Sequence, residues 1–240
     1  MIKDIGLLLL KPLCWLFNSI SEHKRIPKAW KISKVIPVFK KGDPKLVSNY
    51  RPVSNISSLC KVFERCVLNK LLDLGPSELF GPHQHGFFPN WSATTAGLTI
   101  QDYISQGLDD NKVVMMYSAD LSAAFDMLRP QSLISILLDL KLNPNLISLI
   151  QNYLQDRYSY VQINNSFSSM IRVPLGCVQG SVLGPSLFNI YTRNLGHNFP
   201  ECFFKISYAD DSYVALTCDE TEIDDKLNQL STVLRVTLNG

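Results

Sequence analysis

The sequence predicts an α+β fold with helices packed on one face of a mostly antiparallel sheet. Three observations support this: several segments keep helical apolar spacing, several short apolar segments are typical of strands, and turn signals join consecutive strands. The chain has 240 residues, of which 46% are hydrophobic and 18% are charged. That apolar content is enough for one large globular unit or for two small ones that share a core.

The predicted strands are short and rich in β-branched and aromatic residues. The first is followed by a loop over 40–49 with the charge, glycine and proline of a hairpin connection. Asn164 and Asn165 mark a second turn, and the segment 209–211 marks a third. We expect strands at residues 35–39, 113–117, 158–163, 170–173, 202–208 and 212–217.

The predicted helices are recognised by apolar residues at helical spacing and by their end signals. Pro130 and Pro144 each occupy a first helical position, and Gly75-Pro76 ends the first helix. The last helix is amphipathic, with Ile223, Leu227, Leu230 and Leu234 on one face. We expect helices at 56–74, 94–108, 130–140, 144–154 and 220–238, and one that follows a glycine-rich start within 176–195.

The charge is unevenly distributed along the chain. Residues 1–70 contain 14 lysines and arginines against 4 acidic residues, whereas residues 71–240 contain 9 against 17. Blocks of opposite sign suggest a part that faces a polyanion, joined to a part that holds cations. The alternative is a basic face that is simply solvated.

Neither a membrane segment nor a secretion signal is expected. The apolar run 5–10 stops at Lys11 and Pro12, well short of the ~20 residues of a membrane span, and no small-residue cleavage site follows it. The six cysteines, at positions 14, 60, 66, 177, 202 and 218, contain no C-x-x-C pair. They predict reduced, mostly buried thiols in an intracellular protein that is not secreted, and neither a zinc site nor a disulfide framework.

Three aspartates form the candidate functional site. Asp120 ends a buried apolar strand, and Asp210 and Asp211 lie at the tip of a hairpin between two apolar strands. Two carboxylates ~4 Å apart repel by roughly 4 kcal/mol at an effective dielectric constant of 20. Such a pair requires a shared proton or a cation, and oxygen-only ligands favour Mg²⁺ over zinc.

Each aspartate also has a structural interpretation. Two adjacent aspartates at a turn are common because aspartate favours such positions. Asp120 alone could cap a helix over 121–127. If the three do bind cations, two ions close together are the usual apparatus for in-line phosphoryl displacement.

Several segments resemble the reverse transcriptases of non-LTR (LINE-type) retrotransposons. Residues 208–211 match the family's YADD box, and five further segments resemble its other motifs in the family's order and spacing. The similarity covers roughly residues 26–240. The five segments are 36–43, 49–54, 84–87, 117–126 and 176–191.

This resemblance implies a right-hand polymerase fold and RNA-directed DNA polymerase activity. It implies fingers over 1–112, which include a short N-terminal extension and whose helices over 55–110 lead into the palm. The palm, over 113–240, is expected to have a ferredoxin-like antiparallel sheet, to be incomplete at its C-terminus and to be without a thumb. The implied partners are an RNA template, a DNA primer and dNTPs, inside the nucleus or cytoplasm as a ribonucleoprotein. The chain is expected to be a fragment of a retrotransposon polyprotein.

The resemblance also implies the residue roles of the metal site. Asp120 and Asp210 would bridge two Mg²⁺ ions, with Mn²⁺ as a substitute, and Asp211 would complete the acidic group. The Leu121 carbonyl would help to hold the ion on the nucleotide side. The primer 3′-hydroxyl would then attack the α-phosphate of a dNTP, and pyrophosphate would leave.

Further residues match the family's dNTP-binding positions. Phe125 matches the bulky residue that excludes a ribose 2′-hydroxyl, although ordinary core packing is an alternative. Gln179 and Gly180 match residues beside the nascent base pair. Lys40, Lys41 and Arg51 lie on the predicted finger hairpin, where the family contacts the triphosphate; a solvated turn is the alternative for whichever lysine points away.

The sequence departs from the family pattern at three places. Ala123 stands where a lysine is common, Val178 replaces a proline, and the segment 90–92 replaces a basic motif. These departures leave a second hypothesis open: a catalytically incompetent remnant or domesticated palm that only binds nucleic acid. An RNA-dependent RNA polymerase or a nucleotide cyclase is disfavoured, because those families resemble GDD or GGDE at the turn that holds Asp210.

Overall fold

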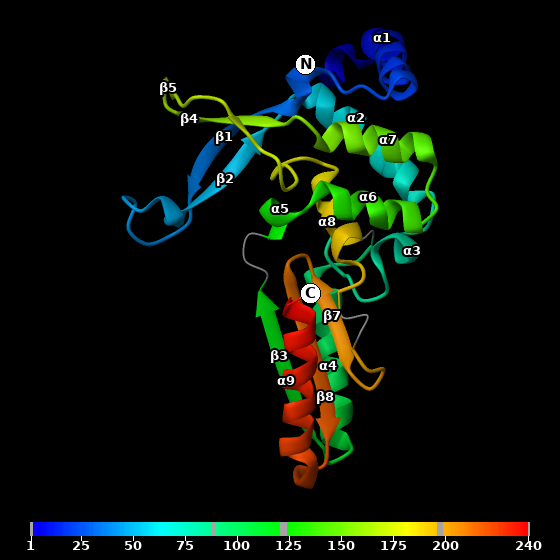
Figure 1. Cartoon of the computed structure of the whole chain (residues 1–240), viewed down its shortest axis with the longest axis vertical. Helices are drawn as coiled ribbons and strands as arrows, with labels where there is room; N and C mark the ends of the chain where they lie inside the picture. Colours follow the sequence, from blue (N-terminus) through cyan, green and yellow to red (C-terminus); the bar gives the residue numbers. More distant parts are fainter. Residues whose placement is uncertain (1, 88–89, 121–123, 196–198, 240) are drawn as a thin grey trace. The chain divides into compact units, whose positions relative to one another are not determined.

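The computed structural model describes residues 2–87, 90–120, 124–195 and 199–239, and the side chains of 8–87, 90–119, 125–195 and 199–234. The α-helices are α1 (Ile2–His23), α2 (Ser58–Leu72), α3 (Pro76–Phe80), α4 (Ala93–Asp109), α5 (Ala124–Met127), α6 (Pro130–Asp139), α7 (Pro144–Leu154), α8 (Gly184–Thr192) and α9 (Ile223–Asn239). Short 3-10 helices are η1 (Lys28–Lys31), η2 (Val47–Asn49) and η3 (Glu220–Glu222). The strands are β1 (Ile32–Phe39), β2 (Tyr50–Asn55), β3 (Val113–Asp120), β4 (Tyr158–Ile163), β5 (Ser166–Phe167), β6 (Ile171–Arg172), β7 (Phe204–Tyr208) and β8 (Asp211–Cys218) (Figure 1).

The mixed helix and strand content confirms the predicted α+β class. The chain forms two compact units, each built from an early and a late segment. Unit 1 comprises Met1–Leu71 and Phe125–Leu187, and unit 2 comprises Leu72–Ala124 and Phe188–Gly240. The division into fingers over 1–112 and palm over 113–240 stays a prediction.

Unit 1 contains a five-stranded sheet. Its strand order is β2-β1-β4-β5, with β6 also paired to β4. β1 and β2 form the expected antiparallel hairpin, whereas β1 and β4 run parallel. The helices add an aromatic cluster in which Phe17 of α1, Trp30 and Phe63 of α2 contact one another with ring centroids 5.3–6.4 Å apart.

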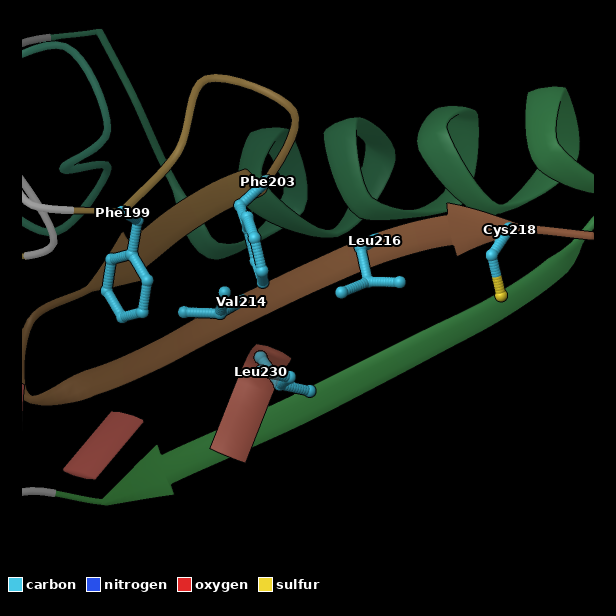
Figure 2. Packing of buried hydrophobic residues seen from close by; sticks show 6 residues of the cluster. All are labelled: Phe199, Phe203, Val214, Leu216, Cys218 and Leu230. Atoms are coloured by element: carbon cyan, nitrogen blue, oxygen red, sulfur yellow. The ribbon is translucent and has the colours of Figure 1, made fainter. Parts of the chain in front are cut away.

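Unit 2 contains a three-stranded antiparallel sheet in the order β3-β8-β7. Alternate residues of β8 face a core that α9 covers, as Figure 2 shows. Period-2 alternation explains this, because every second strand residue points to the same face. The buried residues of this core are Phe199, Phe203, Val214, Leu216, Cys218 and Leu230.

The opposite face of the same sheet packs against α4. The Tyr103 ring stacks on Phe204, with centroids 4.3 Å apart. A Cβ at Gly107 would lie 2.6 Å from Val114 Cγ2 and 2.9 Å from Thr217 Cγ2, so helix and sheet are in close contact. The expectation of helices on one face is therefore wrong for this sheet, which has α4 on one face and α9 on the other.

Two smaller expectations also need correction. Leu227 was expected on the apolar face of the last helix, but 49% of it is exposed, while Leu230 is buried. The thiols were expected to be mostly buried, but Cys14, Cys66 and Cys202 are exposed. All six cysteines are free, as expected. Within the described ranges, no helix is both long and apolar enough to cross a membrane.

Candidate functional site

The strand register of unit 2 brings the three aspartates to one end of the sheet. Asp211 is the first residue of β8, and it pairs with Asp120 of β3 on one side and with Tyr208 of β7 on the other. Paired residues in antiparallel strands have Cα atoms roughly 4.5–5.5 Å apart. Ala209 and Asp210 form the turn between β7 and β8.

The turn is supported from within its own hairpin. The hydroxyls of Ser207 and Ser212 are hydrogen-bonded at 3.0 Å across the pair of strands, directly behind the turn. Asp211 is exposed and Asp210 is half-buried, so solvent ions reach this end of the sheet. The turn thus presents two adjacent carboxylates on a hydrogen-bonded hairpin.

Only part of the expected metal site falls within the structure's described residues. Leu121 lies outside them, and Asp120 is described by its backbone alone. Among the side chains that are described, no group of three possible metal ligands comes together. The donors that are described, Asp210 and Asp211, offer carboxylate oxygens only, and such a donor set fits Mg²⁺ or Mn²⁺.

The residues expected at the nucleotide belong to unit 1. Gln179 and Gly180 lie in the loop before α8, and this loop is attached to β2: the Ser54 amide donates to the Gln179 carbonyl at 2.8 Å. Gly180 has φ +109°, and a Cβ there would lie 2.6 Å from the Ser54 carbonyl oxygen. Only glycine accommodates this backbone and this close approach.

The side chain of Gln179 is held by Asp126. Its amide nitrogen donates to both carboxylate oxygens of Asp126, at 2.9 Å each. The neighbouring Phe125 is half-buried in α5, and its carbonyl accepts a hydrogen bond from the Cys177 amide at 2.9 Å. The short helix α5 and the loop before α8 therefore form one hydrogen-bonded assembly.

The three expected basic residues are exposed on the β1–β2 hairpin. The Lys40 amide donates to the Asn49 carbonyl at 2.8 Å and closes the loop, and Lys41 follows in that loop. Arg51 pairs with Val38 in the ladder, three residues before Ser54. β2 therefore connects Arg51 to the strand position that holds Gln179, although contact with a nucleotide stays a prediction for all of these residues.

A cavity of about 240 Å³ lies beside the loop that carries Gln179. Its walls include Pro52 and Ser54 of β2, and Arg157. Arg157 is only 3% exposed, and its guanidinium donates to the carbonyls of Tyr153 at 3.0 Å and Trp30 at 3.4 Å. The residues that line the cavity thus include two charged ones, Arg157 and Asp126.

Sequence reasoning missed Glu64, a fully buried carboxylate of α2. One of its oxygens accepts from the Val182 amide at 2.6 Å and the other from the Tyr153 hydroxyl at 2.7 Å. Burial, followed by the Glu64 charge, raises the pKa of the Cys60 thiol to about 12 and raises the pKa of Tyr153 well above its usual value. An acidic residue within an apolar helical stripe was the signal that could have found it.

Sequence reasoning also missed the role of Gln84. This side chain is 6% exposed, and its amide bonds to the backbone of Ala209 in the turn before Asp210. The segment 84–87 was expected among the finger motifs. Gln84 lies in unit 2, beside the acidic turn, where its backbone forms a bridge with Ser207 of β7.

The fold is similar to that of solved telomerases. The TM-score is 0.60 to apo telomerase from Candida tropicalis, at 12% identity, covering 89% of this chain and 45% of that one. It is 0.57 to telomerase from Candida albicans in complex with the TWJ fragment of telomeric RNA, at 15% identity, covering 92% of this chain and 43% of that one. These similarities define a right-hand polymerase fold, as expected.

Sequence comparison then identifies the family. Residues 38–238 match the model of the family "Reverse transcriptase (RNA-dependent DNA polymerase)", and the chain belongs to this family. The chain is 33% identical over 185 residues to the "Probable RNA-directed DNA polymerase from transposon BS" of Drosophila melanogaster, covering 76% of this chain and 20% of that protein. It is 28% identical over 210 residues to the RNA-directed DNA polymerase from the mobile element jockey of the same species, covering 84% and 23%.

These relatives confirm the resemblance to the enzymes of non-LTR retrotransposons. The chain spans about a fifth of the length of the curated relatives it matches. The match covers the acidic turn and the loop of Gln179, so both parts of the candidate site belong to the family's shared region.

Proposed function

We propose that this chain forms the polymerase centre of an RNA-directed DNA polymerase, which adds dNTPs to the 3′-hydroxyl of a primer paired to an RNA template. The observation that carries the proposal is the register of β8, because it pairs Asp211 with Asp120 and places Asp210 in the adjoining turn. Membership of the reverse transcriptase family supports the same reaction.

In this proposal Asp120, Asp210 and Asp211 hold two divalent cations, with the Leu121 carbonyl as a further ligand. Two bound Mg²⁺ ions would lower the pKa of the primer hydroxyl and neutralise charge on the triphosphate. The chain contributes ligands fixed on paired strands, which limits the reorganisation needed during the reaction.

The nucleotide would be held by residues of unit 1. Lys40, Lys41 and Arg51 would contact the triphosphate, since basic side chains on an exposed hairpin reach phosphate oxygens readily and arginine binds them in bidentate fashion. Gln179 and Gly180 would lie beside the nascent base pair, and Phe125 would exclude a ribose 2′-hydroxyl. The connection of the Gln179 loop to β2 supports a shared role for these residues.

A metal titration tests the acidic site without requiring turnover. Binding of Mn²⁺ to the 240-residue chain is measured by electron paramagnetic resonance, for the wild type and for Asp210→Asn. We expect Asp210→Asn to weaken Mn²⁺ binding at least about 10-fold, because one carboxylate ligand is lost. Asp219→Asn is the matched control, since Asp219 lies beyond the other end of β8. Equal Mn²⁺ affinity for wild type and Asp210→Asn would refute the metal assignment.

Primer extension on an RNA template tests the reaction itself. The assay uses Mg²⁺ and dNTPs with the 240-residue chain and with any longer reading frame that contains it. We expect extension to be lost in Asp210→Asn. Extension that survives this substitution would contradict the proposed role of Asp210.

The basic character of residues 1–70 favours a second candidate, nucleic-acid binding without extension. This candidate predicts RNA binding that weakens steeply as salt rises, because lysine and arginine release counterions from phosphates. It would be the better description if the chain and every longer form bind RNA in this way but extend no primer.

A further inference from the structure

The turn before Asp210 holds an unfavourable backbone conformation. Ala209 has φ +57°, in the left-handed region. A non-glycine residue there costs roughly 1–2 kcal/mol. Asp210 follows directly, so the conformation of Ala209 determines the direction in which the two aspartates leave the hairpin.

Gln84 binds both polar groups of the Ala209 backbone. Its side-chain oxygen accepts from the Ala209 amide at 3.0 Å, and its side-chain nitrogen donates to the Ala209 carbonyl at 3.2 Å. The same oxygen also accepts from the Gly86 amide at 2.7 Å. One buried side chain from outside the hairpin thus supplies hydrogen-bond partners for both backbone groups of Ala209.

The segment around Gln84 is itself firmly placed. The His85 amide donates to the Ser207 carbonyl at 2.7 Å, and the Ser207 amide donates to the His83 carbonyl at 2.8 Å. Gly86 packs so closely that a Cβ there would lie 2.8 Å from the Ala209 Cα. The fully buried Asn189 of α8 donates to the Gly86 carbonyl at 2.6 Å.

The other side of this segment is covered by the start of α4. The His85 ring contacts the Trp91 ring, with centroids 3.9 Å apart, and its Nδ1 lies 3.3 Å from the Thr95 hydroxyl. Ser92 caps α4 through a reciprocal pair of hydrogen bonds with Thr95. Trp91, which lies in the segment 90–92 that departs from the family pattern, thus has a packing role here.

We infer that Gln84 is a positioning residue of the metal site: it holds Ala209 in the left-handed conformation and so orients Asp210 and Asp211 for cations. This inference rests on the proposed function, because it assumes that the aspartates bind metal. It assigns to the segment 84–87 a role at the acidic turn, in addition to its expected place among the finger motifs.

The test compares Gln84→Met with the wild-type 240-residue chain. Methionine keeps the length and volume of the side chain but neither bonds the Ala209 amide nor donates to its carbonyl. We expect Mn²⁺ affinity to fall about 10-fold, as for other groups that orient metal ligands. We also expect hydrogen exchange of the Ala209 amide to accelerate at least about 10-fold, since its acceptor is lost.

Two variants make the comparison interpretable. Gln106→Met is the matched control: Gln106 is exposed on α4 of the same unit, and its side chain donates to Asp102 of the same helix at 2.9 Å. It should leave both readouts unchanged. Gln84→Asn keeps the amide on a shorter side chain, and it serves if Gln84→Met fails to fold; the same losses are expected, because asparagine cannot span both groups of Ala209.

The two measurements distinguish a failure of the positioning role from a failure of the hydrogen bonds and from a failure of the proposed metal site. Wild-type Mn²⁺ affinity in a folded Gln84 variant whose Ala209 amide exchanges fast would overturn the positioning role. Unchanged exchange at Ala209 in such a variant would overturn the hydrogen bonds themselves. If Asp210→Asn binds Mn²⁺ as tightly as wild type, the proposed metal site fails, and the exchange of Ala209 still decides whether Gln84 holds the turn.

Discussion

Gln179 donates its side-chain amide to both carboxylate oxygens of Asp126, at 2.9 Å each. The two residues are 53 positions apart in the sequence, and their contact connects α5 to the loop before α8 within unit 1. Both bonds come from the one amide nitrogen, so the Asp126 carboxylate holds that end of the Gln179 side chain in place. A glutamine matched to the nascent base pair is thus oriented by an aspartate that follows Phe125 directly.

Replacing Asp126 should therefore impair nucleotide binding. We expect Asp126→Ala to weaken the affinity for a fluorescent dNTP about 5-fold, the effect of ~1 kcal/mol for one hydrogen-bonded contact. Fluorescence anisotropy in the presence of Mg²⁺ measures this affinity. Asp139→Ala, at an exposed position of α6 in the same unit, should leave it unchanged. An Asp126→Ala chain with wild-type affinity would separate Gln179 from nucleotide binding.

Removing the Glu64 carboxylate should destabilise unit 1 strongly. Glu64→Ala leaves the partly buried Val182 amide and the buried Tyr153 hydroxyl without their acceptors. We expect the free energy of unfolding to fall by about 3 kcal/mol. Urea denaturation measures the loss, and Glu22→Ala on the exposed surface of α1 is the control. A loss for Glu64→Ala no larger than that for Glu22→Ala would show that these bonds contribute little.

Adding a side chain at Gly180 should strain the loop that carries Gln179. Gly180→Ala combines φ +109° with a Cβ only 2.6 Å from the Ser54 carbonyl oxygen. We expect a loss of roughly 2 kcal/mol in the free energy of unfolding. Gly97→Ala on α4 is the opposite case, because its Cβ would meet nothing within 4 Å. That variant should gain about 0.5–1 kcal/mol, and a Gly180→Ala chain as stable as wild type would be inconsistent with the described loop.

Acidification should weaken unit 2 through His85. Burial, followed by the His83 charge, lowers the pKa of His85 below its usual 6.5. A folded-state pKa below the unfolded value means that stability is present above pH 6.5 and is lost as pH falls through the lowered pKa. Urea denaturation at pH 7.5 and pH 5 should show this loss. His85→Gln should reduce the difference between the two pH values, whereas His23→Gln on α1 should not; equal differences in all three chains would exclude His85 as the cause.

Local sequence signals predicted the hairpin of the acidic turn. The apolar strands around Tyr208 and Asp211 could be predicted, because strand periodicity and turn residues are signals within a few neighbouring residues. The structure has β7 and β8 at these places, and β3 ends at Asp120 as expected. These are the features whose causes lie within a few residues of the sequence.

The contacts that support the site depend on tertiary packing, and they could not be predicted in the same way. Gln84 and Ala209 are 125 residues apart, and Glu64 and Val182 are 118 apart. No local sequence pattern indicates that the Gln84 side chain bonds the Ala209 backbone, or that the Glu64 carboxylate bonds the Val182 amide. α1 was also not predicted, since Lys11 and Pro12 interrupt its apolar run, yet the helix includes Pro12 and continues to His23.

The exposure of Leu227 also depends on tertiary packing, which local sequence patterns do not predict. Helical spacing places Leu227 with Ile223 and Leu230, but only the positions that meet β8 become buried. The width of the apolar stripe is set by the sequence, whereas the part of it that is covered is set by the partner sheet.

The alternation along β8 links the α9 core to the position of Asp211, because both depend on the register of β8 against β3. Sliding β8 by one residue against β3 would turn Val214, Leu216 and Cys218 out of the α9 core and would reverse the direction of Asp211. The packing of α9 therefore favours the register that pairs Asp211 with Asp120, because it penalises every misaligned pairing of the two strands. Substitutions in this core are therefore expected to loosen the alignment of Asp211 with Asp120.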